Sequence, residues 1–267
     1  MTKRKLPQIG FGTWQITDPQ TCIESVKNAL EVGYRLIDTA QYYRNEEHVG
    51  EGIKQSGIKR EQIVLCTKVW INQLSPKKVM SSTEKSLEKL GTDYIDIHYI
   101  HWPAGKYEPD ETLTTFAELV DQGKIKHIGV SNFKIEHMEK ALEILDKPII
   151  ANQIEVHPLH KERKLRDYLR KKNIKTIAYS PLAKGKIFKI PEITKLAKKY
   201  DVSEARITLA WHLSKENIIP IPKSKNKYHI ADNYEALSLP LDYDDIDIID
   251  NLLDEKKVVN PGHSPWR

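Results

Sequence analysis

The chain has 267 residues, of which 39 % are hydrophobic and 30 % are charged, so it is long enough for a large buried core and too apolar to stay disordered. No apolar run approaches the roughly 20 residues of a membrane-spanning helix, which argues against a membrane protein. The net charge of +5 comes from 42 basic and 37 acidic residues that are mixed along the chain, unlike the clustered basic residues of a nucleic-acid binder.

Predicted strands and helices alternate along the whole chain. Short β-branched or aromatic segments of strand length are each followed by a longer amphipathic segment. The predicted strands are Ile9–Thr13, Tyr34–Ile37, Ile63–Lys68, Tyr94–Ile100, Ile125–Val130, Ile149–Gln153, Ile174–Tyr179 and Ile218–Ile221. Two helices are predicted from Asp18-Pro19 to Gly33 and from Ser75-Pro76 to Gly91, because these pairs combine an N-cap with a helix-starting proline and glycine ends a helix. The other predicted helices are Glu46–Gln55, Glu111–Gln122, Ile135–Leu145, Lys161–Lys172, Pro191–Lys199 and Ser203–Ser214.

About eight strand–helix units without a linker predict an α/β fold of one domain, residues 1–267, in which parallel strands close into a (β/α)8 TIM barrel. A doubly wound open sheet is the main alternative. That fold binds dinucleotides at a G-x-G-x-x-G turn, and the segment Gly10-Phe11-Gly12-Thr13-Trp14-Gln15 lacks the third glycine and the helix that should follow. We therefore favour the barrel.

The cysteines and the first residues of the chain indicate the cellular compartment. Cys22 and Cys66 lie in apolar segments and form no disulfide framework. Residues 1–7 carry charge without an apolar stretch behind them, so we expect no signal peptide and a cytoplasmic protein. The basic run at residues 163–172 has helical spacing with Leu165 and Leu169 on the other face, and we interpret it as a solvated helix surface.

Polar and ionisable residues gather where the predicted strands end, which in a barrel is the catalytic rim. They are Asp38, Lys68, His101, Ser131, Asn132, Asn152, Gln153, Tyr179, Ser180, Lys223 and Ser224. Singly, each has a structural interpretation: Asp38 as a helix cap, His101 as a core histidine. A lysine that closes an apolar strand is harder to dismiss, because burying an ammonium is costly unless it is paired.

Together these residues suggest carbonyl chemistry. Asp38 can pair with Lys68, and an ammonium beside a tyrosine lowers the phenol pKa from about 10. Such a tyrosine can protonate an alkoxide as it forms, and His101 can hydrogen-bond the same oxygen. The hydride has to come from a cofactor.

The motifs around these residues resemble those of the aldo-keto reductases. They are Gly33-Tyr34-Arg35-Leu36-Ile37-Asp38-Thr39-Ala40 with Tyr43, Asn45-Glu46 and Val49-Gly50; Thr67-Lys68-Val69-Trp70; His101-Trp102-Pro103; Gly129-Val130-Ser131-Asn132-Phe133; Asn152-Gln153-Ile154-Glu155; Tyr179-Ser180-Pro181-Leu182; and Ile221-Pro222-Lys223-Ser224. The resemblance extends from Ile9 to about Asn233. Each motif is weak alone, but the ordered set is strong.

The resemblance implies roles for individual residues. The catalytic tetrad would be Asp38, Tyr43, Lys68 and His101, with Tyr43 rather than Tyr42 in the family's tyrosine position. Cofactor binding would involve Thr13, Trp14, Asp38, Ser131, Asn132, Gln153, Tyr179, Ser180, Leu182, Lys223, Ser224, His229, Asp232 and Asn233. Trp14, Trp70 and Trp102 would line an apolar substrate pocket suited to small aldehydes and ketones.

Two departures from the family pattern affect specificity. His229 stands where arginine is usual and Asp232 where glutamate is usual, so NADH is expected to be accepted alongside NADPH. The tail after the last helix, residues 258–267, is short and is all that covers the pocket from that side, so analogy with larger family members does not identify the substrate.

The sequence thus predicts an NAD(P)-dependent oxidoreductase that reduces small aldehydes or ketones, and the resemblance suggests a monomer. The alternative is a non-catalytic nicotinamide-nucleotide-binding barrel subunit of a larger assembly. No metal is expected: His98 and His101 should face opposite sides of a strand, and His157 and His160 lack partners at metal-ligand spacing.

Overall fold

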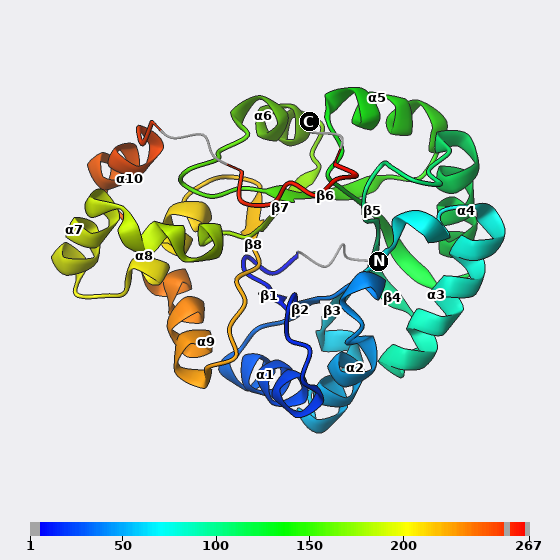
Figure 1. The fold of residues 1–267 in the computed structure, drawn as a ribbon, viewed down its shortest axis with the longest axis horizontal. Coiled ribbons are helices and arrows are strands. Elements are labelled where there is room, and N and C mark those ends of the chain that lie inside the picture. Colours follow the sequence, from blue (N-terminus) through cyan, green and yellow to red (C-terminus); the bar gives the residue numbers. More distant parts are fainter. Residues whose placement is uncertain (1–5, 254–256, 265–267) are drawn as a thin grey trace.

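Eight parallel strands form the centre of the computed structural model, which describes residues 6–253 and 257–264 (Figure 1). The strands are β1 Phe11–Gly12, β2 Leu36–Asp38, β3 Val64–Val69, β4 Ile95–Ile100, β5 Ile125–Ser131, β6 Ile149–Glu155, β7 Lys175–Tyr179 and β8 Ile218–Pro220. Each pairs in parallel with the next in chain order. Of residues 1–7, on which the absence of a signal peptide was predicted, 1–5 lie outside the described part, as do the last three of the tail.

Backbone hydrogen bonds close the sheet on itself. The N–H groups of Gly10 and Gly12 donate to the carbonyl oxygens of Pro220 and Pro222, each at 3.0 Å, and so join the first strand to the last. A Cβ at Gly12 would lie 3.0 Å from the carbonyl oxygen of Ile221, so this seam needs a residue without a side chain. The predicted (β/α)8 barrel is confirmed.

The helices surround the barrel (Figure 1). They are α1 Pro19–Val32, α2 Glu46–Gln55, α3 Pro76–Leu90, α4 Pro109–Asp121, α5 Ile135–Ile144, α6 Arg163–Lys171, α7 Pro191–Tyr200, α8 Glu204–Leu213, α9 Lys227–Tyr234 and α10 Tyr243–Asp250. The side chain of Asp18 accepts a hydrogen bond of 2.8 Å from the backbone N–H of Thr21, as expected of an N-cap. Helices α9 and α10 were not predicted. In α6 Leu165 and Leu169 are buried, as predicted.

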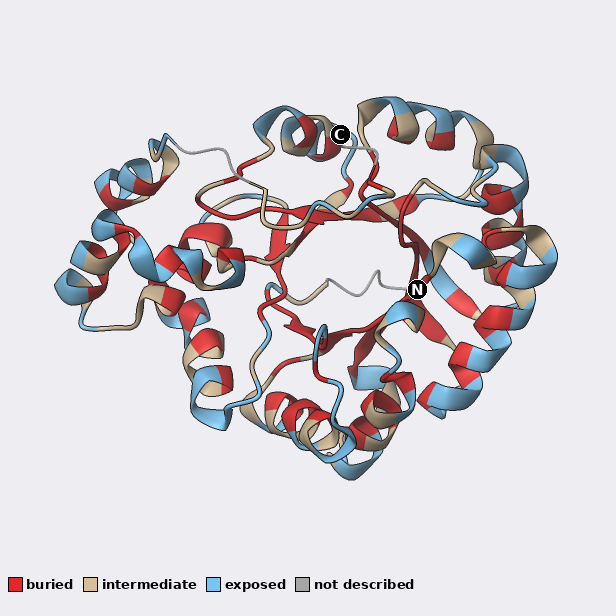
Figure 2. Cartoon of the chain, viewed as in Figure 1, coloured by how far each residue is buried: buried red, intermediate tan, exposed pale blue. Residues whose placement is uncertain are grey.

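The alternation of side chains along each strand separates two cores. One side faces the barrel interior, where Leu36, Cys66, Ile97 and Ile177 pack together. The other side packs against the helices, and Figure 2 shows buried residues on the strands and on the inner faces of the helices around them. Gly129 leaves room inside the barrel for the ring of Tyr99, whose nearest atoms would lie 2.5 Å from a Cβ there.

A third core lies beside the barrel, between α7, α8 and α10. Ile193 and Leu196 of α7 pack with Trp211 of α8 and with Ile249 of α10. These helices lie together at the left of Figure 1. Among the residues that the structure describes, no helix is both long enough and apolar enough to cross a membrane.

Candidate active site

The predicted site residues meet at the carboxyl ends of the strands, around a cavity of about 670 Å³. Strand alternation explains the meeting: Asp38 and Lys68 follow the interior residues Leu36 and Cys66 by two positions, so they point inward too. The predicted residues that line the cavity are Trp14, Asp38, Tyr43, Trp70, His101, Trp102, Ser131, Asn132, Gln153, Tyr179, Ser180, Leu182, Lys223, Ser224, His229, Asp232 and Asn233.

Two predicted site residues lie behind the cavity wall. Lys68 is fully buried. Thr13 is buried as well, and its hydroxyl donates to the carbonyl oxygen of Asp38 at 3.0 Å. The structure therefore gives Thr13 a contact that fixes the end of β2, without direct access to the cavity.

Lys68 connects the acidic and phenolic groups of the site. Its Nζ lies 2.5 Å from Oδ1 of Asp38 and 3.3 Å from the hydroxyl of Tyr43, and it also donates to the carbonyl oxygen of Thr39 at 2.7 Å. The second carboxylate oxygen of Asp38 accepts a bond of 2.7 Å from Nε2 of Gln153. The buried ammonium thus has three partners, as a buried charge requires.

Burial and neighbouring charges act in opposite directions on the pKa values of both Lys68 and Tyr43, and a different effect is the larger one in each case. Burial alone would lower the pKa of Lys68, but the charge of Asp38 outweighs it, so the net pKa is raised and the side chain stays charged. The predicted lowering of the Tyr43 pKa is wrong as a net effect. Burial of the phenol raises that pKa, and Lys68 acts in the expected direction without overcoming it. Tyr43 therefore holds its proton at neutral pH, which is the form an acid needs.

His101 follows β4 and is held neutral. Burial, and then the positive charge of Lys68, lower its pKa well below 6.5. Its ring lies 5.8 Å from that of Tyr43, and neither ring nitrogen has a hydrogen-bond partner among the described residues. A neutral imidazole can donate one hydrogen bond to an oxygen that enters beside Tyr43. His98 instead faces the helices, where it contacts Thr83 and Thr67, so the predicted opposite orientation is confirmed.

The ends of β5, β6 and β7 form a hydrogen-bonded group that we call the amide cluster: Ser131, Asn132, Gln153 and Tyr179. The Tyr179 hydroxyl donates to the side-chain oxygen of Asn132 at 2.9 Å. The side-chain nitrogen of Asn132 donates to the Ser131 hydroxyl at 3.0 Å. The side-chain oxygen of Gln153 accepts no hydrogen bond from the described residues, so this buried amide keeps bonding capacity toward the cavity.

The far end of the cavity is polar and lies between α8, α9 and the segment after β8. It is lined by Lys223, Ser224, His229, Asp232 and Asn233. Asp232 accepts two hydrogen bonds from Arg206 of α8, at 3.0 and 2.6 Å, and another from Ser203. Asp232 thus ties α9 to α8. Sequence patterns did not indicate Arg206, because its partner lies 26 residues away.

Aromatic rings form the other wall of the cavity. Tyr42 is stacked between Trp14 and Trp70, with ring centroids 5.7 and 4.0 Å away. Trp102 is buried, and Trp14 is 38 % exposed at the mouth. The three predicted tryptophans therefore share the pocket, and Tyr42, which was not predicted to line it, completes their stack.

The C-terminal tail covers one side of the cavity. Val259, Pro261 and His263 all line it, in agreement with the expectation that the short tail covers the pocket from this side. The ring of His263 lies 5.1 Å from those of both Trp70 and Trp102. The tail has no hydrophobic periodicity, so only long-range contacts could reveal its course.

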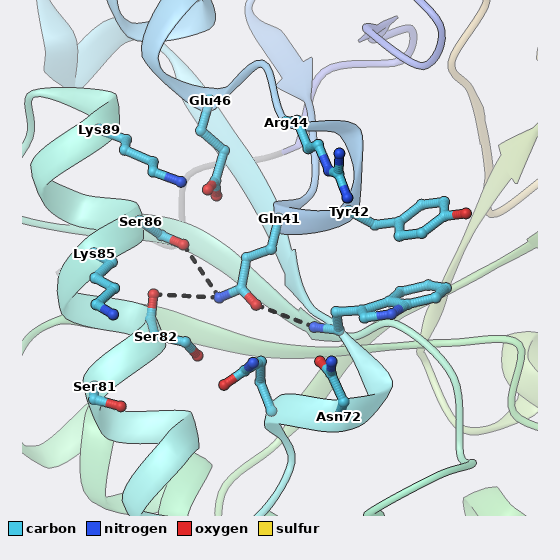
Figure 3. A pocket seen from close by; sticks show the side chains of 12 residues that line it. Gln41, Tyr42, Arg44, Glu46, Asn72, Ser81, Ser82, Lys85, Ser86 and Lys89 are labelled. Atoms are coloured by element: carbon cyan, nitrogen blue, oxygen red, sulfur yellow. Dashed lines mark hydrogen bonds between the residues drawn. The ribbon is translucent and has the colours of Figure 1, made fainter.

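A smaller cavity of about 330 Å³ lies on the other side of the aromatic wall (Figure 3). Tyr42 and Trp70 line both cavities. Gln41 reaches across the smaller one: its amide nitrogen donates to Ser82 and Ser86 of α3, each at 3.2 Å, and its oxygen accepts from the backbone N–H of Trp70 at 3.1 Å. Gln41 thereby holds the backbone of Trp70, which also lines the larger cavity, against α3.

His157 and His160 lie beside the cavity rim, each near a carboxylate. Nε2 of His157 is 2.9 Å from Glu155, and Nε2 of His160 is 2.8 Å from Glu162. Within the described ranges no group of three or more histidine, cysteine or acidic side chains is arranged to hold a metal ion.

A closed parallel barrel with an ionisable cluster at the carboxyl ends of its strands is the architecture of barrel enzymes. The model of the Aldo/keto reductase family matches residues 8–254. Glyoxal reductase of Bacillus subtilis is 38 % identical over 254 residues, which cover 95 % of this chain and 91 % of that protein. Methylglyoxal reductase of Salmonella typhi is 39 % identical over 259 residues, 96 % of each chain.

A solved structure agrees with these relatives. An aldo-keto reductase from a Medee basin deep-sea metagenome superposes with a TM-score of 0.92 at 37 % identity, covering 96 % of this chain and 95 % of that one. The chain belongs to the aldo-keto reductase family.

Proposed function

We propose that this protein is an NAD(P)H-dependent reductase of small aldehydes and ketones, with Tyr43 as the general acid. One observation carries the proposal: the Nζ of Lys68 lies 2.5 Å from Asp38 and 3.3 Å from the Tyr43 hydroxyl, beside His101, at the cavity of about 670 Å³. These are the groups that carbonyl reduction needs around one oxygen atom.

Each residue of the tetrad has a distinct task. Tyr43 donates its proton to the substrate oxygen as negative charge develops there. His101, neutral and without a protein partner, donates a hydrogen bond to the same oxygen and orients it. Lys68 stabilises the phenolate that remains on Tyr43, and Asp38 keeps Lys68 charged and in position. When bound, the reduced nicotinamide supplies the hydride that the carbonyl carbon accepts.

The lining of the cavity fits a nicotinamide dinucleotide. The amide nitrogen of a carboxamide is a hydrogen-bond donor, and the amide cluster offers it two acceptors, the side-chain oxygens of Gln153 and Asn132. The ring of Tyr179 offers a flat face for the nicotinamide. Ser180 and Leu182 would border the pyrophosphate, and Trp14 the ribose beside the nicotinamide. The adenosine end would meet Lys223, Ser224, His229, Asp232 and Asn233.

We propose that the enzyme uses both NADPH and NADH. The 2′-phosphate that distinguishes NADPH from NADH binds best to a guanidinium, through a planar pair of hydrogen bonds. Arg206 is already bound to Asp232, and the exposed His229 stands at the far end of the cavity, where the resemblance implies that an arginine is usual. Lys223 and Ser224 remain as partners for the phosphate, so NADPH is bound without strong rejection of NADH.

The substrates are short carbonyl compounds. The aromatic wall of Trp14, Tyr42, Trp70 and Trp102 is apolar and has few polar groups to anchor a large sugar-like ligand. Two relatives are named glyoxal reductase and methylglyoxal reductase, which favours short aldehydes as the first compounds to assay.

Turnover separates this proposal from the alternative, a non-catalytic nucleotide-binding barrel. Purified protein with NADPH or NADH and an excess of propanal or methylglyoxal should lose absorbance at the reduced-cofactor wavelength. Loss of this signal in Tyr43→Phe, with cofactor binding retained, would assign the activity to this site. Cofactor binding without turnover of any carbonyl would favour the non-catalytic barrel.

We also propose that the enzyme works as a cytoplasmic monomer. Both cysteines are buried as free thiols, which suits a reducing compartment. Sedimentation of the purified protein tests the monomer, and fractionation of the source cells tests the compartment.

A further inference from the structure

The smaller cavity of about 330 Å³ is a second place where a ligand can enter the molecule. It lies between α3 and the segments that follow β2 and β3, on the other side of the aromatic wall from the tetrad (Figure 3). Its volume falls within the range of small-molecule sites, roughly 300–1,000 Å³. No residue of the tetrad lines it, so its ligand is not the reacting carbonyl compound.

Three cationic side chains line this cavity. Figure 3 shows that Lys85 and Lys89 extend from α3, whereas Arg44 extends from the segment after β2 on the opposite side. None of the three side chains donates a hydrogen bond to a described residue or forms an ion pair with one. Lysine and arginine are both charged at neutral pH, so positive charge faces the cavity from two sides.

The cavity is lined by a single carboxylate, and that carboxylate is already bound. Glu46 is 3 % exposed, and its Oε1 accepts a hydrogen bond of 2.6 Å from the hydroxyl of Thr67. Burial raises the pKa of Glu46, against the opposing effects of Thr67, Ser86 and Lys89. One buried carboxylate against three cations leaves the cavity with a net positive charge.

Neutral side chains add further hydrogen-bond donors to the cavity. Asn72 and Gln73 line it, and neither side-chain amide is hydrogen-bonded within the part of the chain that the structure describes. The lining therefore combines unused N–H donors with a carboxylate whose charge is directed elsewhere. A molecule whose polar atoms are all acceptors, such as the oxygens of carboxylate or phosphate groups, is the complement of such a lining.

We propose that the smaller cavity binds a small organic polyanion, a di- or tricarboxylate or a phosphate ester, between Arg44 on one side and Lys85 and Lys89 on the other. The guanidinium can bind one anionic group through a planar pair of hydrogen bonds, and the two ammonium groups attract a second as point charges. This site is separate from the proposed cofactor and substrate positions, and it does not depend on the proposed function.

Calorimetric titrations with citrate, inorganic phosphate and acetate test the proposal, at neutral pH and constant ionic strength because salt screens exposed charges. Citrate carries several carboxylates, whereas acetate carries a single negative charge. We expect citrate or phosphate to bind the wild type and acetate to bind far more weakly. Tighter binding of citrate identifies a polycarboxylate as the ligand, and tighter binding of phosphate identifies a phosphate group.

Two variants remove one cation each from the cavity. Arg44→Gln and Lys85→Gln should each raise the dissociation constant of the polyanion about 10-fold, the effect of one hydrogen bond to a charged group. Lys77→Gln is the matched control, because Lys77 is an exposed lysine of the same helix that does not line the cavity. It should leave the dissociation constant unchanged. Thermal unfolding verifies that each variant is intact.

Lys223→Gln separates this site from the larger cavity, where Lys223 can also attract anions. Polyanion binding that is lost in Lys223→Gln and unchanged in Arg44→Gln and Lys85→Gln would overturn the inference. Equal losses in Lys77→Gln and Lys85→Gln would overturn it as well, because they indicate a general effect of surface charge. A wild type that binds neither citrate nor phosphate, or binds acetate as tightly, has no such site.

Discussion

Lys68 is the residue on which the site depends most. It is fully buried, and its charge is compensated by Asp38 and by the carbonyl oxygen of Thr39. The predicted lysine at the end of an apolar strand was informative because such a residue needs partners. The structure supplies them from β2 and from the segment after it.

Replacement of Tyr43 by phenylalanine should abolish most reduction. The variant loses only the hydroxyl that lies 3.3 Å from Lys68, so kcat/KM should fall about 10²- to 10⁴-fold while NADPH binding is retained. Steady-state kinetics and a fluorescence titration measure the two quantities. Tyr42→Phe is the matched control, since it keeps the ring stacked between Trp14 and Trp70. Equal losses in the two variants would contradict the assignment.

Replacement of Lys68 by methionine should change the pH profile. Lys68 lowers the pKa of Tyr43 against the stronger effect of burial, so its removal raises that pKa further. Tyr43 must be protonated to act as an acid, and activity is therefore lost as pH rises through its pKa. The alkaline limb of the residual kcat/KM should move to higher pH.

The same variant should also be less stable. Asp38 would remain buried without its cationic partner, which typically costs ~3–5 kcal/mol of the free energy of unfolding. An unmoved alkaline limb together with near-wild-type turnover would show that Lys68 has only a structural role.

His229→Arg should increase the preference for NADPH. A guanidinium at the far end of the cavity can form the paired hydrogen bonds with the 2′-phosphate that an imidazole cannot. A hydrogen bond to a charged group contributes ~1.5–3 kcal/mol, so the ratio of kcat/KM for NADPH over NADH should rise roughly 10-fold or more. A wild type that ignores NADH, or a variant with an unchanged ratio, would mean that the adenosine end binds elsewhere.

At the scale of elements, the helices that sequence patterns missed are α9 and α10. Each has only eight residues, and the four aspartates of α10 mask its apolar face. Their structure depends on packing: Asp232 ties α9 to α8, and Ile249 enters the core shared with α7 and α8. Short helices of this kind are stable mainly through such tertiary contacts.

Ile249→Ala tests the role of α10. Ile249 is fully buried, and its truncation should lower the free energy of unfolding by about 2–4 kcal/mol, as large-to-small core substitutions do. Ile248 is the neighbour on the solvent side, 42 % exposed, and Ile248→Ala should cost less than about 0.5 kcal/mol. Urea unfolding of both variants measures the difference. Equal costs would show that α10 is not packed as described.

For the molecule as a whole, buried histidines set the response to acid. Burial lowers the pKa of His98 and of His212 to about 4. In the unfolded chain a histidine binds its proton near pH 6.5. Between these values the unfolded state binds more protons, so stability is full above about pH 6.5 and falls as pH drops toward 4.

Each of these histidines should lower the free energy of unfolding by up to about 1.4 kcal/mol per pH unit in that window. Urea unfolding at about pH 7 and about pH 5 gives the slope. His98→Gln should reduce the slope, because it removes one of the two histidines whose pKa is lowered to about 4. A slope that His98→Gln leaves unchanged would assign the acid sensitivity to other groups.

Much of the architecture was determined by local sequence. Strand-length apolar segments alternate with amphipathic helices, and this order alone restricts the chain to a few topologies. The carboxyl ends of the strands of a parallel barrel lie at the same rim, so Asp38, Lys68 and His101 could be assigned to that rim before any contact was known. Helix caps such as Asp18 could also be predicted, because the capping side chain and the N–H group that it binds lie within one helical turn of each other.

What the tertiary structure decided depends on residues far apart in the chain. The net direction of the Tyr43 pKa follows from how completely the folded chain removes the phenol from water, and no motif encodes that burial. The Arg206–Asp232 pair and the contact of Glu155 with Val258 and Val259 span 26 and more than 100 residues. The path of the tail, and with it the position of His263 over the pocket, is settled by these long-range hydrogen bonds, because the tail has no periodic pattern that could specify it locally.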